Sequence, residues 1–405
     1  MLNKIFNNLF GNAFFALSQL ILFVYISRQY GVESLGIYSY SLAIATIMYM
    51  VSNVGLRNVL ATDLSSKSED STYIKLRLSL SIITLFVGVV VFMISINTNL
   101  LFCILILLIK YIESIQDIYV GFLHRKQLFA KIRTVNFFKG AFVFLSIIGV
   151  MLMELSINSL LLILVLFNSI ILCFLIYNSN IDFGNSSNEL IVRKYKDLIL
   201  FSFPFAVMGV LATVNLNGPR IFIKSNLGLE ALAKYSAMYQ IVFLGSVVVL
   251  AYGQAVLPHL TNLFMKGMVD KWLKLIIKSM LAILFCTMAV FLVGYHYGVA
   301  IMSYVFGTIT FHRLEISMFI LLGFASYFLN IMSYAFQSLR NGKGLVKYSI
   351  LLTIIHLAII PIVIVSGGMK SVIFVTMVYY FLNAILIAFS CRKILRSNIE
   401  SLSCK

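Results

Sequence analysis

Residues 100–123 read LLFCILILLIKYIESIQDIYVGFL, an apolar run of helical length with three charged residues near its middle. At 100° per residue, Lys110, Glu113 and Asp117 fall within an arc of about 60° on a helix. A charge at the centre of a bilayer costs at least about 2.5–3.5 kcal/mol, so this stripe must face a polar cavity or other protein. The stretch therefore predicts a membrane helix with a hydrated, charged side, which is typical of a protein that moves a polar solute.

Apolar segments of this kind recur along the whole chain, which is 61% hydrophobic and only 11% charged over its 405 residues. About 20 apolar residues suffice to cross a bilayer as a helix. Twelve spans are predicted, with a mixed connection at 296–313: residues 7–27, 37–58, 74–96, 100–123, 134–153, 156–177, 199–223, 235–257, 274–295, 314–336, 348–366 and 371–391. The composition thus predicts an all-α integral membrane protein.

The net charge of +17 follows the predicted topology. Most of the 31 lysines and arginines fall in loops on the side of the N-terminus, such as Arg125, Lys126 and Lys131 after the fourth span. Cytoplasmic loops of membrane proteins are enriched in Lys and Arg, so both termini are expected in the cytoplasm. The basic excess is therefore explained by topology, and no nucleic-acid partner is expected.

The longest polar segment, residues 178–197, divides the predicted spans six and six. The predicted domains are an N-terminal six-helix bundle at 1–180, a cytoplasmic linker at 181–198, a C-terminal six-helix bundle at 199–393 and a cytoplasmic tail at 394–405. Six spans per half give both halves the same orientation, as in transporters built from parallel repeats related by a pseudo-two-fold axis.

A short motif supports this duplication. Residues 31–39, GVESLGIYS, align without gaps to residues 228–236, GLEALAKYS, at an offset close to half the chain length. Both copies lie between the first two spans of their half. Gly31 and Gly228 are expected to end helices in a left-handed conformation, with Glu33 and Glu230 favoured near the start of the next helix by its dipole. The motif is therefore interpreted as part of the fold rather than of a site.

Within the fourth span, Lys110 lies about 15 Å from the predicted outer end, close to the bilayer centre. Lys110 and Glu113 are three residues apart and can pair, and Glu113 and Asp117 can share a proton or cation. One interpretation is an ion-coupling site beside an anion-binding lysine; the other is a buried salt bridge that fixes helix packing. Lys139 is interpreted as an interfacial anchor, and His356 as a hydrogen-bonded packing residue.

The seventh span contains Asn217, Gly218, Pro219, Arg220 and Lys224 in close succession. This composition predicts a kinked or interrupted helix that lines a cavity or packs on protein. The Arg220 guanidinium suits a phosphate because its planar fork donates two hydrogen bonds at once.

Two further arginines are candidates for binding the same phosphate. Arg28 approaches the outer part of the cavity from the other half, and Arg57 lies near the cytoplasmic face at the end of the second span. For Arg28, Lys224 and Arg57, snorkelling to lipid headgroups is the alternative.

Several functions are disfavoured. The chain has no GxxxxGK[ST] motif for nucleotide binding. The outer loops are too short to hold a soluble catalytic domain. The five cysteines show no metal-binding or disulfide spacing and are interpreted as small buried residues. No enzyme activity, catalytic residue, metal or cofactor is expected.

Three segments carry a family resemblance: RQYGVESLGIYSYS at 28–41, VGLRNVL at 54–60, and NLNGPRIFIKSNLGLEALAKYS at 215–236 followed by GQAVLPHL at 253–260. The chain resembles the bacterial polysaccharide flippases, which export O-antigen and capsule repeat units and belong to the multidrug/oligosaccharidyl-lipid/polysaccharide (MOP) exporter superfamily. Ile221 replaces the usual Tyr of the family pattern, Ala233 replaces its second Gly, and Gln254 stands at the repeat position of Arg57.

The resemblance implies a V-shaped pair of six-helix bundles around a central cationic cavity in the bacterial plasma (inner) membrane. The implied substrate is an undecaprenyl-diphosphate-linked oligosaccharide, moved from the inner to the outer leaflet by alternating access. Arg220 and Lys110 are then expected to hold the diphosphate, with help from Arg57, Arg28, Lys224 and Asn217, while Glu113 and Asp117 provide coupling if they bind H⁺ or Na⁺. The implied partners are membrane lipid and the polysaccharide polymerase machinery.

Two alternatives stay open at this stage. A cation-coupled multidrug exporter of the same superfamily predicts a cavity dominated by acidic and aromatic groups, and the charges here are largely basic. A non-transporting membrane scaffold for polysaccharide assembly gives no reason for Lys110 and Glu113 to be buried. A major facilitator is disfavoured because the second-to-third loop lacks that family's Gly-…-Asp-Arg-x-Gly pattern.

Overall fold

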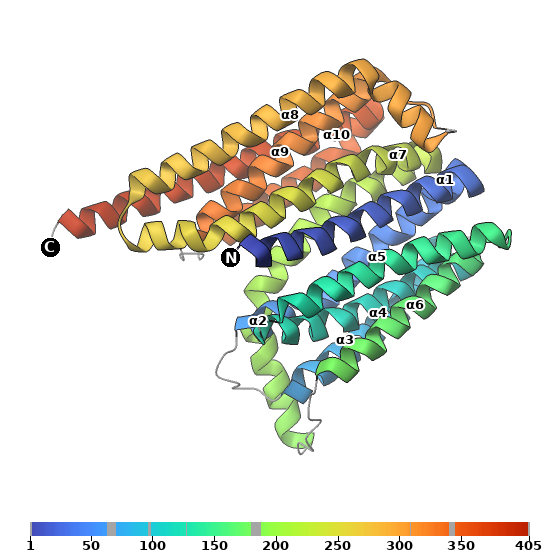
Figure 1. The fold of residues 1–405 in the computed structure, drawn as a ribbon, viewed down its shortest axis with the longest axis horizontal. Helices are drawn as coiled ribbons and strands as arrows, with labels where there is room; N and C mark the ends of the chain where they lie inside the picture. Colours follow the sequence, from blue (N-terminus) through green and yellow to red (C-terminus); the bar gives the residue numbers. More distant parts are fainter. Residues whose placement is uncertain are drawn as a thin grey trace. The chain divides into compact units, whose positions relative to one another are not determined.

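The computed structural model describes residues 2–62, 70–95, 99–126, 128–179, 188–307, 309–339 and 345–403. Within these ranges every regular element is an α-helix (Figure 1). In chain order they are α1 (Leu2–Asn53), α2 (Leu56–Thr62), α3 (Asp70–Ser95), α4 (Leu100–Arg125), α5 (Phe129–Leu152), α6 (Ile157–Ser179), α7 (Asn188–Met265), α8 (Val269–Phe306), α9 (Arg313–Ser338) and α10 (Leu345–Ser403). The prediction of an all-α protein is confirmed for the described residues.

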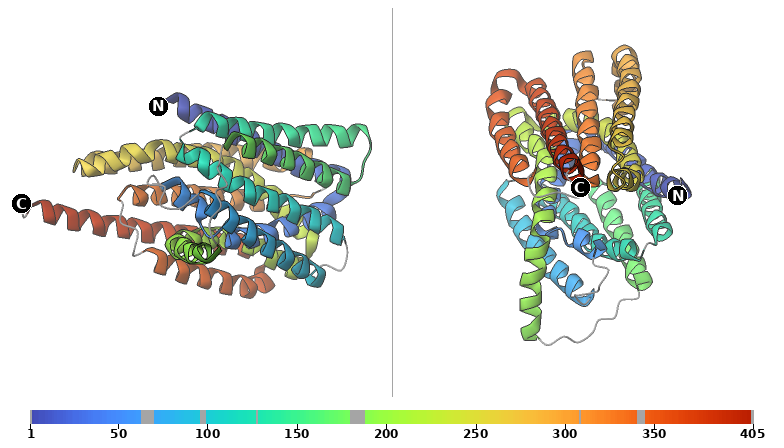
Figure 2. Two further views of the ribbon diagram at one scale, coloured as in Figure 1. Left: turned by 90° about the horizontal axis from the view of Figure 1, so that it is seen from below. Right: turned by 90° about the vertical axis from the view of Figure 1, so that its left-hand side faces the viewer.

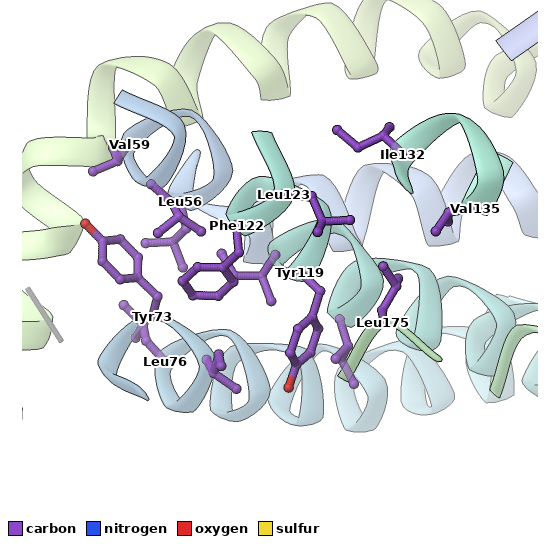
Figure 3. Packing of buried hydrophobic residues seen from close by; sticks show 14 of the residues in the cluster. Leu56, Val59, Tyr73, Leu76, Tyr119, Phe122, Leu123, Ile132, Val135 and Leu175 are labelled. Atoms are coloured by element: carbon purple, nitrogen blue, oxygen red, sulfur yellow. The ribbon is translucent and has the colours of Figure 1, made fainter. Parts of the chain in front are cut away.

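The chain forms two compact units, Met1–Ile221 and Phe222–Lys405. In the first unit, α1 packs along α5, and α4 packs against both α3 and α6 (Figures 1 and 2). One apolar core joins α2, α3, α4, α5 and α6, and Leu56 and Phe122 within it are 0% exposed (Figure 3). Short α2 is held in this core against α4, and this contact positions the site described below.

In the second unit, α9 packs against both α8 and α10. Its apolar core includes Trp272 of α8, whose indole N–H donates a 2.9 Å hydrogen bond to the hydroxyl of Ser338 at the end of α9. Satisfying the indole N–H allows this large ring to be buried without loss of a hydrogen bond.

Among the described residues, eight helices are long and apolar enough to cross a membrane. Large apolar side chains on them face outward, such as Ile94 at 78% and Val365 at 81% exposed, as expected for surfaces that contact lipid rather than water. Helix α4 is not among the eight, although its 26 residues are long enough, because it carries three charges in its central turns.

Three of the long helices are broken at a glycine with non-helical backbone: Gly31 in α1, Gly228 in α7 and Gly368 in α10. If the two sides of each break are treated as separate spans and α4 is included, the helices are consistent with the twelve predicted spans. The predicted separation of 348–366 from 371–391 coincides with the break at Gly368.

The repeated glycines adopt the same conformation. Gly31 has φ 88° and ψ 170°, and Gly228 has φ 87° and ψ −179°. The positive φ agrees with the prediction, but ψ is extended rather than left-handed helical, a region that essentially only glycine occupies. Burial also matches between the copies, since Leu35 and Leu232 are both 0% exposed. The motif is therefore a repeated feature of the backbone.

Three predicted boundaries are wrong. The second span was expected to run to residue 58, but α1 ends at Asn53 and α2 begins at Leu56, because Val54 and Gly55 both have positive φ. The connection at 296–313 is helical as far as Phe306. The interruption expected around 215–219 is not present, since the non-helical residue inside α7 is Gly228.

The predicted linker at 181–198 lies partly outside the described residues, because 180–187 are not described and α7 begins at Asn188. The predicted tail at 394–405 is helical as far as Ser403. The bundle boundaries remain predictions. Among the cysteines, Cys103 and Cys391 are buried as expected, whereas Cys173 and Cys286 are exposed, contrary to the prediction, and the side chain of Cys404 is not described.

Candidate functional site

A strained turn introduces the main polar cluster of the first unit. Val54 has φ 45° and Gly55 has φ 65°, and a positive φ is a genuine outlier for a β-branched residue such as Val. Gly55 also touches α7, where an added Cβ would lie 2.8 Å from the backbone of Ala206. The turn redirects the chain so that Arg57, in the first turn of α2, faces α4.

One carboxylate joins two arginines in this cluster. Oδ1 of Asp117 on α4 lies 2.6 Å from Nη1 of Arg57. Oδ2 of the same carboxylate lies 3.1 Å from Nη2 of Arg77 on α3. The other Nη of Arg57 lies 3.0 Å from Nε2 of His124. The side chain of Arg77 is fully buried, while that of Arg57 is 40% exposed. Two guanidinium groups share one carboxylate, so the cluster has an excess of positive charge.

Asn53 extends the network. The side-chain oxygen Oδ1 of Asn53 accepts hydrogen bonds from Arg77 Nη1 and, at 2.9 Å, from the hydroxyl of Ser114. The Ser114 hydroxyl is also 3.1 Å from that of Ser81. These contacts fix the end of α1 against α3 and α4. Buried polar groups cost stability unless they are hydrogen-bonded, and both Nη atoms of Arg77 have such partners, in Asn53 and Asp117.

The cluster borders a cavity of about 350 Å³, here called the arginine cavity. Its lining comes from α1, α2, α3, α4, α7 and the 54–55 turn: Met50, Asn53, Gly55, Leu56, Arg57, Arg77, Asp117, His124, Phe205 and Ala206. The cavity therefore combines an electropositive wall with an apolar one.

A second, smaller cavity lies among α1, α4, α5 and α6 and is called here the lysine cavity. It has a volume of about 70 Å³ and is lined in part by Lys110, Glu113, Lys139, Gln19 and Asn168. Nζ of Lys110 is 2.7 Å from Oε2 of Glu113. The predicted pairing of these two residues is present, and their side chains are 22% and 27% exposed.

The structure changes the interpretation of two basic residues. Lys139 was expected to be an interfacial anchor, but it lies in the central turns of α5, about 15 Å from the helix start, and lines the lysine cavity. Arg77, which lines the arginine cavity, is not among the site residues predicted from the sequence. A sequence signal existed for Arg77, because it lies two turns inside an apolar helix that begins at Asp70.

The remaining predicted site residues lie elsewhere. Arg220 is 6% exposed, and its Nη1 is 3.3 Å from the side-chain oxygen of Asn217, whose amide donates to the Thr213 carbonyl at 3.0 Å. Lys224 is half-buried and Arg28 is exposed. None of these four lines the arginine or the lysine cavity. The structure thus pairs Arg57 with Asp117 and Lys110 with Glu113. Lys110 lines the lysine cavity, whereas Arg220 lines neither of the two cavities.

Polar groups of the second unit are engaged in packing. Lys234 Nζ is 2.6 Å from Oε2 of Glu315, which also accepts from the backbone N–H of His312 at the start of α9. His356 stacks on Tyr379 with ring centroids 4.5 Å apart, and its Nε2 is 3.2 Å from the Thr376 hydroxyl. Among the described residues, no group of three or more His, Cys, Asp and Glu is placed to hold a metal ion.

Residues 1–264 match the model of a family described as polysaccharide biosynthesis protein. The chain belongs to this family. One relative is the capsular polysaccharide biosynthesis protein CapF of Staphylococcus aureus, which is 25% identical over 314 residues, covering 75% of this chain and 77% of CapF.

Solved structures of MOP superfamily transporters share the fold of this family member. An inward-facing multidrug resistance transporter of the MATE family matches with a TM-score of 0.73 and 14% identity over 95% of each chain. A MOP superfamily transporter from Pyrococcus furiosus matches with a TM-score of 0.66 and 15% identity over 97% of this chain and 96% of its own. This polysaccharide biosynthesis protein is therefore a multi-pass membrane protein with the fold of MOP superfamily transporters.

Proposed function

We propose that this protein is a flippase that moves an undecaprenyl-diphosphate-linked oligosaccharide from the inner to the outer leaflet of the bacterial plasma membrane by alternating access. The product would serve surface polysaccharide biosynthesis. Family membership and the capsular relative support the substrate class. The observation that carries the proposal is the arginine cavity, in which two guanidinium groups share a single carboxylate.

A diphosphate suits this arrangement. Arg57 is the more exposed of the two arginines, so its planar fork is accessible from the cavity and can donate two hydrogen bonds to phosphate oxygens. An incoming diphosphate would compete with Asp117 for Arg57, while Asp117 stays with buried Arg77. The carboxylate thus acts as a counter-ion for Arg57 until the substrate replaces it.

The other predicted substrate residues enter the same proposal as contacts along the path. Arg220 with Asn217, Lys110, Arg28 and Lys224 would meet the diphosphate or the sugars at other stages of transport. Glu113 and Asp117 would provide H⁺ or Na⁺ coupling only after release from Lys110 and from the two arginines.

The distribution of Lys and Arg along the sequence supports cytoplasmic N- and C-termini. The polysaccharide polymerase machinery would take the exported product. No chemical conversion of the substrate by this chain is proposed.

Replacement of Arg57 by Gln tests the proposal. The substitution keeps a polar side chain but removes the charged fork, so we expect export of surface polysaccharide, and translocation of labelled lipid-linked oligosaccharide in reconstituted vesicles, to fall by about ten-fold or more. Lys271→Gln is the matched control, because Lys271 is an exposed residue of α8 outside both cavities. Unaltered translocation by the Arg57→Gln protein would contradict the proposal.

Arg220→Ala provides a second test. Loss of surface polysaccharide at a normal protein level would support a substrate role for this buried guanidinium. Unaltered export would remove Arg220 from the path.

The alternatives predict different results in the same vesicles. A multidrug exporter would move a lipophilic cation and leave the lipid-linked oligosaccharide in place. A scaffold for polysaccharide assembly would move neither compound.

A further inference from the structure

The lysine cavity is separate from the arginine cavity. The two share no lining residue, and the lysine cavity is enclosed by α1, α4, α5 and α6 within the first unit. Its volume of about 70 Å³ is several times the roughly 10–15 Å³ that one water needs. The space therefore suits a small ion with one or two waters and is too small for a sugar chain.

Positive charge exceeds negative charge in this cavity. Lys110 and Lys139 contribute two ammonium groups, and Glu113 contributes the one carboxylate of the lining. Glu113 is paired with Lys110 at 2.7 Å. Among the described residues, none forms a hydrogen bond or ion pair with Lys139, but the Glu113 carboxylate interacts electrostatically with it as well as with Lys110.

The excess charge lies deep in a helix bundle. Lys110 and Lys139 each occupy the eleventh position of their helix, in the central turns of α4 and α5. Because Glu113 is the one carboxylate facing both lysines, the lining carries one net positive charge. A net charge at the centre of a membrane costs at least about 2.5–3.5 kcal/mol. A bound anion would remove this cost.

The remaining polar lining also favours an anion over a cation. The Gln19 amide can donate hydrogen bonds into the cavity, as can the two ammonium groups. The Asn168 amide is already engaged, since it donates to the Leu164 carbonyl at 2.8 Å. A metal cation would meet two like charges and only one carboxylate, which is itself already paired.

We propose that the lysine cavity binds a small monovalent anion, of which chloride is the candidate by size and charge. The anion would lie between the ammonium groups of Lys139 and Lys110, opposite Glu113. It would complete the charge balance of the first unit and hold α4 and α5 together at mid-membrane. The site shares Lys110 and Glu113 with the proposed transport path, but its anion binding can be measured without the lipid-linked substrate.

Thermal unfolding of the purified full-length protein in detergent tests the site. The midpoint of unfolding is measured while chloride replaces gluconate at constant ionic strength, because a ligand that binds only the folded state raises the midpoint with its concentration. We expect chloride, and bromide, to raise the midpoint of the wild-type protein in a saturable manner. A midpoint that is the same in chloride and gluconate would overturn the proposal.

Two substitutions should shift the response in opposite directions. Lys139→Gln removes one ammonium group and should raise the chloride concentration for half-maximal stabilisation by at least about ten-fold. Glu113→Gln removes the carboxylate and should lower it. Lys131→Gln is the control, since Lys131 is on α5 but contacts Asn178 outside the cavity. An unchanged response of Lys139→Gln, or a weaker response of Glu113→Gln, would contradict the assignment.

If either variant fails to fold, the site is tested by ³⁵Cl NMR on the wild-type protein. We expect the protein to broaden the ³⁵Cl resonance and added bromide to reverse the broadening. No broadening beyond that of detergent alone would overturn the site. None of these measurements uses lipid-linked substrate, so their failure would leave the flippase proposal standing.

Discussion

At the scale of single residues, buried Arg77 makes Asp117 a structural residue as well as part of the cavity. Asp117→Asn would leave the fully buried guanidinium without its carboxylate, so we expect a loss of about 3–5 kcal/mol in the free energy of unfolding. Glu33→Gln, at an exposed carboxylate of the repeated motif, should leave this quantity unchanged. The comparison can be made by denaturant unfolding in detergent, and equal stability of the two variants would show that Arg77 does not depend on Asp117.

The glycines of the repeated motif allow a second prediction at this scale. A Cβ at Gly31 or Gly228 meets no atom within 4 Å, so substitution by Ala would act through the backbone conformation alone. We expect Gly31→Ala and Gly228→Ala each to reduce the free energy of unfolding by about 1–3 kcal/mol. Gly149→Ala is the matched control, because it is equally free of contacts but lies inside α5. A similar loss in all three proteins would refute the assigned conformation.

Local pairs were predictable from the sequence and distant ones were not. Lys110 and Glu113 are one turn apart, so helical periodicity alone places them together. Arg77 meets Asn53 and Asp117, which come from two other helices. Helical periodicity does not show which residues of different helices will touch, so Arg77 was not predicted as a site residue. Lys139 was misplaced because the predicted start of its span, at residue 134, lies five residues after the true start of α5 at Phe129.

At the scale of elements, two tyrosines of α9 dock on two glycines of α7 within the second unit. The hydroxyl of Tyr327 donates to the Val242 carbonyl at 2.9 Å, and that of Tyr334 donates to the Leu250 carbonyl at 3.3 Å. Each acceptor lies three residues before a glycine, Gly245 or Gly253, whose missing Cβ leaves room for the tyrosine ring. This repeated contact sets the spacing of α7 and α9.

Substitution of these glycines should separate the two helices. A Cβ at Gly245 would overlap the Tyr327 side chain, and we expect Gly245→Ala to lower the free energy of unfolding by about 1–3 kcal/mol through overpacking. Gly323→Ala should be far milder, since its Cβ would make ordinary contacts at 3.4 Å or more. Adding Tyr327→Leu to Gly245→Ala should recover part of the loss; additive losses, measured by the same unfolding assay, would contradict direct contact.

The helical type of the segments followed from their apolar length, but the ends of the helices did not. The prediction of separate spans at 348–366 and 371–391 agrees with the break at Gly368, because a polar and glycine-containing segment separates two apolar runs. The expected interruption near Pro219 is absent, and the Asn and Gly residues there remain within a continuous helix. Composition shows where a helix can be interrupted, whereas packing in the folded protein determines where it is interrupted.

At the scale of the whole molecule, the two units share the glycine conformation of the repeated motif but differ in charge. Arg57 belongs to a cluster of ionised groups in the first unit, whereas Gln254 stands at the corresponding position of the second. Both cavities described here, and the excess positive charge in each, lie in the first unit. The two copies of the motif therefore share a glycine conformation, while the clustered basic groups of both cavities lie in the first unit.

This asymmetry has a consequence for the energy of transport. In the proposed flippase, a fixed guanidinium would bind the diphosphate without crossing the membrane itself, so the net negative charge of the substrate would move through the electric field. Each such charge carried outward gains about 2.3 kcal/mol per 100 mV, inside negative. In proteoliposomes with a potential set by K⁺ and valinomycin, we expect labelled lipid-linked oligosaccharide to accumulate in the leaflet facing the positive side. The distribution should become even when the potential is collapsed. Accumulation that ignores the potential but follows a Na⁺ or H⁺ gradient would instead show that a co-transported cation neutralises the substrate.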